Sequence, residues 1–245
     1  TTREAGETIT MLHFQTNFIY RHHWNVKSLW AKALVSLLFV SALGELPVAR
    51  AQDSSVAIEA LEQLVVKGRA PKTGYSRAAF GPTWSDVDRN GCDTRNDILK
   101  RDLVQVIFKE KTKNCVVLSG VLNDPYSGEQ ISFIRGNTTS TLVQIDHVIA
   151  LGNAWVTGAF QMTVKQRTAL ANDPLNLLAV KGSLNSQKQD GDAATWLPPN
   201  KNYRCEYIAR QISVKKKYGL WITAPEKDAM KRILDKCPTQ RLITG

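Results

Sequence analysis

The sequence lacks several features that would assign it to a common protein class. Its apolar stretch at residues 33–43 is far shorter than the ~20 residues that a membrane-spanning helix needs. No C-x-x-C pair occurs among its four cysteines, which argues against a structural zinc site. No internal repeat, low-complexity tract, dimer-forming heptad or recognisable base-reading module is present. These absences favour one globular domain of ordinary composition.

Histidine is scarce as well, and its distribution is informative. Four histidines occur in 245 residues, and His147 is the only one after position 23. It follows Asp146 within an apolar run, where a polar, titratable pair is costly to bury without a purpose. Asn176 lies downstream, followed by Asn185 and Lys188 in the spacing Asn-x-x-Lys. This order of residues is typical of a metal-dependent nuclease site of the HNH type.

The N-terminal residues have the pattern of a secretion signal. Arg21, Lys27 and Lys32 precede the apolar stretch, and Ala49-Arg50-Ala51 resembles a cleavage site with small residues. We interpret residues 1–51 as an N-terminal extension and signal peptide, and residues 52–245 as a single domain. An uncleaved anchor or a buried helix is the alternative. We expect a secreted protein without stable membrane association after cleavage.

The cysteines and the charge fit an exported, basic domain. Cys92, Cys115, Cys205 and Cys237 all follow the expected cleavage site, and an even count favours disulfides, although four cysteines allow three pairings. We expect Cys92–Cys115 and Cys205–Cys237, because each pair closes a local loop. Residues 52–245 contain 27 basic and 19 acidic residues, and this formal net charge of +8 predicts association with polyanions. A positive face that is only solvated is the alternative.

The apolar pattern predicts a mixed α+β domain. Helices are expected over residues 54–67, 97–109, 163–171, 183–189, 204–214 and 223–236. Strands are expected over residues 115–122, 130–134, 141–149 and 177–180, with a turn at 123–128 joining the first two. Residues 72–91 are rich in Gly, Pro, Ser and Asp, which predicts a long ordered loop.

Each residue of the constellation has a possible role in phosphodiester hydrolysis. His147 can be the general base, because a neutral imidazole has its pKa near working pH. Asp146 and Asn185 offer the hard oxygen ligands that Mg²⁺ prefers. Lys188 is expected on the same helix face as Asn185, where it could hold a phosphate oxygen. Arg95 and Arg135 are further candidate phosphate contacts, for which a structural ion pair is the alternative.

Regular strand geometry would separate Asp146 from His147. Adjacent side chains of a strand point to opposite faces, so the two can serve one phosphate only if the strand ends, bends or bulges there. We expect the amide of Asn176 to hold the backbone in that irregular shape. The simpler interpretation makes Asn176 a turn residue, and Asn185 and Lys188 solvated helix residues.

A wider set of motifs accompanies this constellation between Lys72 and Cys237. They are Gly91–Leu99 (GCDTRNDIL), Ser119-Gly120, Asp124–Gly128 (DPYSG), Asn153–Trp155 (NAW), Asn172–Leu177 (NDPLNL), Asn185–Lys188 (NSQK) and Trp196–Pro199 (WLPP). With Ile145-Asp146-His147, they make the chain resemble the HNH (ββα-metal, His-Me finger) nucleases. The similarity is greatest to secreted proteins related to the C-terminal nuclease domain of GmrSD-type restriction enzymes.

The resemblance implies a fold, an activity and residue roles. The implied fold is α+β, with an HNH-like ββα-metal core, additional helices and an antiparallel hairpin, stabilised by disulfides. The implied protein is a secreted endonuclease that hydrolyses DNA phosphodiester bonds with low sequence specificity, using one divalent metal ion, Mg²⁺ or Mn²⁺. By matching position, Asp146 and Asn185 ligate the metal, His147 is the base, and Asn176 orients the loop that bears the base.

One departure and two alternatives accompany this interpretation. The family's Asp-His is commonly followed by x-x-Pro, whereas Ala150 and Leu151 stand in that region here, which puts the local loop shape in doubt. The same site could act on RNA or on another phosphodiester polymer. A noncatalytic basic protein that binds nucleic acid or the cell envelope is the alternative from another functional class. Nucleic acid, most simply DNA, is the expected partner, and no protein partner is predicted.

Overall fold

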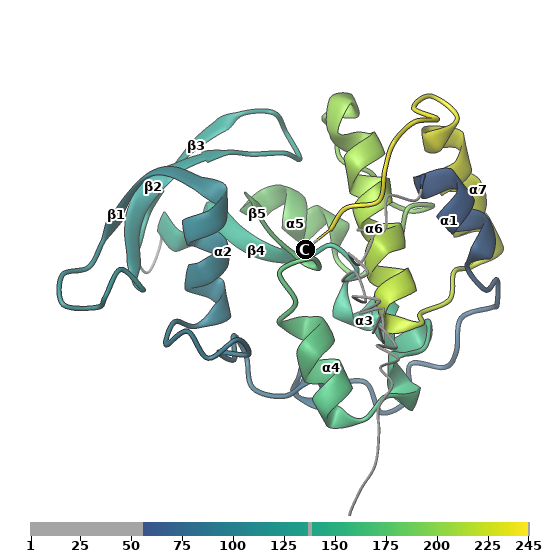
Figure 1. Cartoon of the computed structure of the whole chain (residues 1–245), viewed down its shortest axis with the longest axis horizontal. Coiled ribbons are helices and arrows are strands. Elements are labelled where there is room, and N and C mark those ends of the chain that lie inside the picture. The colour runs from purple at the N-terminus through teal and green to yellow at the C-terminus, as the bar shows by residue number, and fades with distance from the viewer. Residues whose placement is uncertain (1–55, 137–138, 245) are drawn as a thin grey trace, which may run out of the picture. The chain divides into compact units, whose positions relative to one another are not determined.

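The chain combines helices with two small antiparallel sheets (Figure 1). The computed structural model describes residues 56–136 and 139–244, so the expected signal peptide lies outside the described residues. Within them, no helix has the length and apolar character needed to cross a membrane. The helices are α1 (Ala57–Gln63), α2 (Thr94–Asp102), α3 (Leu151–Val156), α4 (Val164–Ala171), α5 (Gly182–Lys188), α6 (Arg204–Tyr218) and α7 (Ala224–Leu234).

The strands form one sheet of three and one of two. The larger sheet has the order β1 (Leu103–Phe108), β2 (Val117–Asn123) and β3 (Gln130–Ile134). The smaller sheet pairs β4 (Val143–His147) with β5 (Leu177–Lys181) in antiparallel register. This mixture of helices and antiparallel strands confirms the general class expected from the sequence.

Strand β1 is the largest departure from the expected elements. A helix over residues 97–109 is predicted, but α2 ends at Asp102 and residues 103–108 form a strand. Most of these residues (LVQVIF) are β-branched or aromatic, types that favour strands and lose side-chain freedom in helices. β1 pairs with β2, with Val104 opposite Val121 and an irregularity at Gln105, whose φ is 54°. The pairing with β2, the next strand along the chain, therefore decides this segment.

Helix α3 is absent from the expected elements. All six of its residues, Leu151–Val156, are buried. A helix that is buried all round has no polar face, so the amphipathic period used to find helices is missing. α3 follows β4 closely, and α4 then leads the chain back to β5, so the two strands of the small sheet are neighbours in space but distant in sequence.

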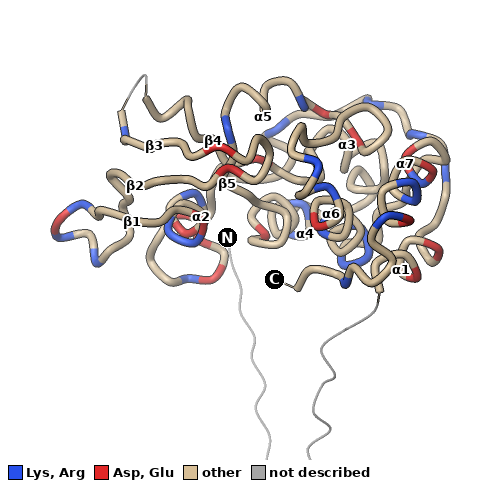
Figure 2. Tube along the Cα trace, turned by 90° about the horizontal axis from the view of Figure 1, so that it is seen from above, with Lys and Arg blue, Asp and Glu red and all other residues tan. Residues whose placement is uncertain are grey.

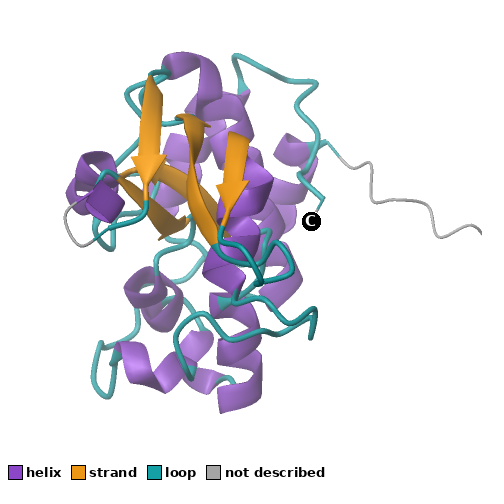
Figure 3. Ribbon diagram, turned by 90° about the vertical axis from the view of Figure 1, so that its left-hand side faces the viewer, coloured by secondary structure: helices purple, strands orange, loops and turns teal. Residues whose placement is uncertain are grey.

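The small sheet lies between two parts of the hydrophobic core. Val148 and Val180 pack with apolar residues of α1, α6 and α7. Val143 and Leu177 pack instead with residues of α2 and the three-stranded sheet. Figure 1 shows the three-stranded sheet at one end of the described part and α1, α6 and α7 at the other, and Figure 3 shows the strands from the first end, with helices behind them. The end of β4 is therefore held from both sides.

Both expected cysteine pairs form disulfides. Cys92–Cys115 joins the segment before α2 to the loop before β2, and Cys205–Cys237 joins the start of α6 to the residues after α7. The loops they close span sequence separations of 23 and 32 residues. In the chain-entropy model, each crosslink stabilises the fold by about 3–4 kcal/mol.

Carboxylates organise the loop that precedes α2. Asp86 accepts hydrogen bonds from the backbone N–H groups of Asn90 (3.1 Å) and Gly91 (2.9 Å). The spacing Asp86-x-Asp88-x-Asn90-Gly91, with Asp97 in the twelfth position, is that of a calcium-binding loop. Within the described ranges, however, no three His, Cys, Asp or Glu side chains are placed to hold a metal. In this structure the loop is stabilised by its own hydrogen bonds.

Removing one disulfide tests how much the fold depends on it. We expect the double substitution Cys205→Ala and Cys237→Ala to lower the free energy of unfolding by about 3–4 kcal/mol, because the unfolded chain regains the entropy of an open loop. Urea denaturation under non-reducing conditions measures the change. Treating the variant with a reductant should then open only Cys92–Cys115. A loss below about 1 kcal/mol would contradict the expectation.

Candidate active site

Asp146 lies at the centre of a buried charge network. Its Oδ1 accepts a hydrogen bond from Lys188 Nζ (3.0 Å), and its Oδ2 accepts one from the Tyr126 hydroxyl (2.6 Å). Lys188 Nζ also donates to the backbone carbonyl of His147 (2.8 Å). The Lys188 side chain is fully buried and that of Asp146 is 5% exposed. The ion pair therefore ties the end of β4 to α5.

The environment of Asp146 has opposing effects on its protonation. Burial has the largest effect and raises the pKa of the Asp146 carboxyl group above its usual value, although Lys188 and the Tyr126 hydroxyl act to lower it. Burial and the charge of Asp146 raise the pKa of Tyr126 well above its usual value, so this hydroxyl stays protonated and donates. The ammonium and the hydroxyl together supply the compensation that a buried carboxylate requires.

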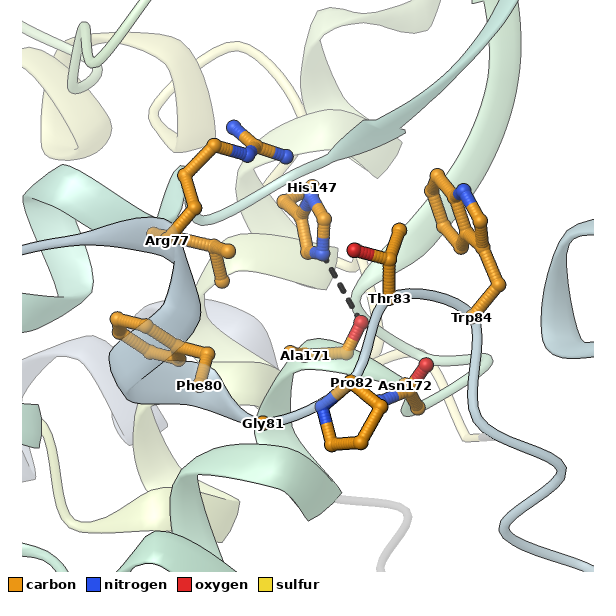
Figure 4. A pocket seen from close by; sticks show the side chains of 10 residues that line it. Arg77, Phe80, Gly81, Pro82, Thr83, Trp84, His147, Ala171 and Asn172 are labelled. Carbon is orange, nitrogen blue, oxygen red and sulfur yellow. Dashed lines mark hydrogen bonds between the residues drawn. The ribbon is translucent and has the colours of Figure 1, made fainter.

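His147 is held in one tautomer by a backbone carbonyl. Its Nε2 lies 2.9 Å from the carbonyl oxygen of Ala171 (Figure 4). A carbonyl can only accept, so Nε2 carries the proton and Nδ1 has a free lone pair in the neutral ring. The indole of Trp84 stacks on the imidazole, with ring centroids 6.0 Å apart and an interplanar angle of 16°. The ring is therefore fixed at its edge and on one face.

The imidazole is neutral over the ordinary pH range. Burial lowers the pKa of His147 to about 3. The hydrogen bond to Ala171 opposes this shift, while the positive charges of Arg77 and Lys188 contribute to it. The low pKa means that an unprotonated Nδ1 is available throughout the range in which most nucleases work.

Asn176 holds the backbone that follows His147. Strand β4 ends at His147, as the geometry of adjacent side chains requires. The carbonyl oxygen of Asn176 then accepts from Val148 N, and its Oδ1 accepts from Ile149 N, both at 2.8 Å. Its Nδ2 donates to the carbonyl of Leu170 (3.2 Å). The fully buried amide thus joins this bend to the end of α4.

A polar cavity of about 260 Å³ borders these residues. Its lining includes Asp146, His147 and Asn185, which the sequence predicts as one site, and also Arg77 and Asp190. Two elements that are distant in sequence, β4 and α5, therefore converge on one space. A second, smaller cavity lies against His147 and Trp84 (Figure 4).

The oxygen atoms at this cavity fit a hydrated Mg²⁺ or Mn²⁺ ion. Asn185 Nδ2 donates to Gln144 Oε1 (2.9 Å), which leaves the Asn185 amide oxygen for a cation. Each carboxylate oxygen of Asp146 accepts one hydrogen bond and keeps a further lone pair. Mg²⁺ keeps several waters and needs few protein ligands, whereas a structural zinc site needs four. Among the residues described, no set of His, Cys, Asp and Glu forms such a closed site.

The structure corrects the expectation for Lys188. A substrate phosphate contact requires an ammonium that faces solvent, but this one is fully buried against Asp146 and the His147 carbonyl. Arg135 donates to Asn96 Oδ1 (2.5 Å) and to the Val117 carbonyl (2.6 Å), so it braces α2 against β2. Arg95 is half-buried beside Arg135, and neither arginine lines the two cavities at His147.

Three side chains near His147 have no recognisable signal in the sequence. Arg77, Trp84 and Asp190 lie in or beside loops, where no period or spacing marks them. Tyr126 belongs to the DPYSG motif, which points to a turn but not to a bond with Asp146. The distribution of positive charge does not single out Arg77 either. Figure 2 shows Lys and Arg residues distributed over the β1–β2 loop, α2, α6 and α7 rather than gathered at one element.

Comparison with known proteins identifies the family. Residues 93–233 match the family model described as "GmrSD restriction endonucleases, C-terminal domain". A protein of Arthroderma benhamiae named "Uncharacterized secreted protein" is 37% identical over 186 residues, which cover 75% of this chain and 86% of that protein. No solved structure matches the chain. The chain therefore belongs to the family of GmrSD restriction endonuclease C-terminal domains, as its motifs indicate.

Replacement of Lys188 tests the buried ion pair. We expect Lys188→Met to lower the free energy of unfolding by about 3–5 kcal/mol, because it leaves the Asp146 carboxylate buried without a cation. Urea denaturation measures the loss. The control is Lys181→Met, which removes an exposed ion pair with Glu129 and should cost at most about 1 kcal/mol. Equal losses in the two variants would contradict the assignment.

Titration of the metal-free protein tests the state of His147. We expect its ¹⁵N resonances to be those of a neutral ring protonated at Nε2, with a pKa of about 3 rather than the usual 6.5. Burial disfavours the imidazolium, so the ring should stay neutral as the pH falls through the usual value. NMR of a ¹⁵N-histidine sample provides the measurement, with His147→Ala to assign the signal. A midpoint near 6.5 would show an exposed ring.

Proposed function

We propose that this protein is a secreted, divalent-metal-dependent endonuclease. It hydrolyses phosphodiester bonds, with DNA as substrate and little sequence preference. The observation that carries this proposal is a neutral imidazole with a fixed tautomer. It lines the same cavity as the oxygen-bearing side chains of Asp146 and Asn185. Membership of a restriction endonuclease family supports the reaction class.

His147 acts as the general base in this proposal. Its Nδ1 accepts a proton from the attacking water, while the Ala171 carbonyl holds the opposite ring nitrogen. The indole of Trp84 keeps the ring plane in place. Because the low pKa leaves the ring unprotonated but weakly basic, the water also needs activation from another source. A divalent ion, when bound, stabilises negative charge on the phosphate and on the departing oxygen.

Asp146 and Asn185 hold the cation in this proposal. Asp146 supplies a carboxylate from β4, and Asn185 supplies an amide oxygen from α5. Lys188 acts through Asp146 as a positioning residue, since it fixes the carboxylate and the His147 backbone together. Asn176 positions the base by shaping the residues after it. Strands β4 and β5 with α5 then make up the ββα-metal core.

Secretion fits the chemistry of the chain. Both disulfides require an oxidising environment to persist. The relative from Arthroderma benhamiae carries the name of a secreted protein. We therefore place the enzyme outside the cell, where the net charge of +8 on residues 52–245 favours contact with nucleic acid.

Nicking of supercoiled plasmid DNA tests the proposal. We expect cleavage with Mg²⁺ or Mn²⁺, its loss in EDTA, and a fall of about 10²–10⁴-fold in rate for His147→Ala, because the general base is gone. We expect Asn185→Ala to raise the Mg²⁺ concentration needed for half-maximal rate, whereas Asn185→Asp keeps an oxygen ligand and should lose less. Gel assays on DNA, run in parallel on RNA, give these rates.

The controls separate catalysis from folding and from binding. Circular dichroism and thermal unfolding of His147→Ala should match those of the wild type, apart from the small effect of removing one side chain. Cleavage that survives both EDTA and His147→Ala would refute the metal and base assignments. Salt-sensitive DNA retention without any cleavage in Mg²⁺, Mn²⁺ or Zn²⁺ would favour a noncatalytic binding protein.

A further inference from the structure

The charges around the cavity leave one cation without a counterion. The Asp146 carboxylate is paired with Lys188 (3.0 Å), and the Asp190 carboxylate is paired with Lys72 (2.6 Å). The Arg77 guanidinium lines the same cavity, and in the described ranges it has no side-chain hydrogen bond or ion pair. The cavity therefore carries an unbalanced positive charge, which an anion would complement.

Arg77 is placed beside the proposed base. Arg77 is exposed, and it lines both cavities that border His147. Figure 4 shows its guanidinium on the side of the imidazole away from the Ala171 carbonyl, which is the side of the free Nδ1. A water molecule that gives its proton to Nδ1 and an anion held by Arg77 would thus be neighbours.

The segment that carries Arg77 is anchored to the domain. Arg77 begins the short 3₁₀ helix Arg77–Phe80, whose preceding residue Ser76 caps it by accepting from Ala79 N (3.2 Å). Arg167 Nε donates to the Ala79 carbonyl (2.6 Å). Phe80 is buried against Trp155. The backbone position of Arg77 is therefore fixed, while its guanidinium remains available.

We propose that Arg77 binds a nonbridging oxygen of the scissile phosphate. This inference rests on the proposed nuclease function and identifies the residue that holds the substrate anion at that site. A guanidinium has five N–H donors in a planar fork that matches a phosphate, and it stabilises charge that grows on the phosphate oxygens. It takes the role that Lys188, buried in its ion pair, does not fill.

Arg77 lies outside the residues that match the family model. That match begins at residue 93, whereas Arg77 and Trp84 come from the preceding segment. The segment nevertheless supplies Arg77, the proposed anion ligand, and Trp84, which stacks on His147. The complete site of this chain therefore includes residues beyond the recognised family core.

Steady-state cleavage of a fluorescent DNA oligonucleotide at saturating Mg²⁺ tests this proposal. We expect Arg77→Ala to lower kcat about 10²-fold, because one donor to the transition-state charge is lost. We expect Arg77→Lys to restore part of the rate, and added guanidinium ion to rescue Arg77→Ala but not His147→Ala. The control Arg232→Ala removes an equally exposed arginine from α7 and should leave kcat unchanged. Melting temperatures of the two alanine variants should agree.

The outcomes distinguish this proposal from the proposed function. If the wild type cleaves DNA and Arg77→Ala matches Arg232→Ala in kcat and KM, the role of Arg77 is refuted and the nuclease function stands. If the wild type does not cleave in any metal, the nuclease function fails, and fluorescence anisotropy with the same oligonucleotide decides about Arg77. Weaker binding by Arg77→Ala than by Arg232→Ala supports an anion site, and equal binding overturns it.

Discussion

The ion pair between Asp146 and Lys188 is the interaction on which the site depends. A carboxylate at the end of β4 is buried among aromatic side chains, where it is tolerated only because an ammonium from α5 and the Tyr126 hydroxyl compensate it. The same ammonium holds the His147 carbonyl. One cation therefore fixes β4, helix α5 and the backbone of the proposed base relative to one another. Because the Lys188 ammonium is buried, it cannot contact a substrate phosphate.

His147 illustrates how burial and hydrogen bonding set up a base. The ring is removed from water, stacked on Trp84 and bonded at Nε2 to a backbone carbonyl. Burial makes the imidazolium unfavourable, so the ring is neutral and its free nitrogen is defined. The cost is a weak base, and in the proposed function Asp146 and Asn185 would hold a divalent cation that supplies further activation.

The two cavities beside His147 combine contributions from separate parts of the chain. The family core supplies the carboxylate, the imidazole and the amide, whereas the segment before it supplies Arg77 and Trp84. Both carboxylates that line the larger cavity have lysine partners. The Arg77 guanidinium is therefore the group that we propose to bind an anion. A positively charged pocket beside a neutral base is the arrangement expected for attack on a phosphodiester.

Much of the fold follows from local sequence, because caps, turns and apolar periods act over a few residues. Helices α4 and α7 begin where expected, at capping boxes formed by Thr163 and Thr223. β3 has the expected bounds, and both disulfides form as loop closure suggests. The segment that becomes β1 and the buried helix α3 could not be found in this way. The first depends on pairing with another strand, β2, and the second has no polar face to give a period.

The sequence by itself determined which residue types the site would contain, since a lone histidine beside an aspartate, followed by two asparagines, marks the family. Only the tertiary structure decided their partners. It buried Lys188 against Asp146, turned Arg135 toward Asn96, and brought Arg77 to His147. Burial and charge compensation arise between segments far apart in the chain, so no local pattern encodes them.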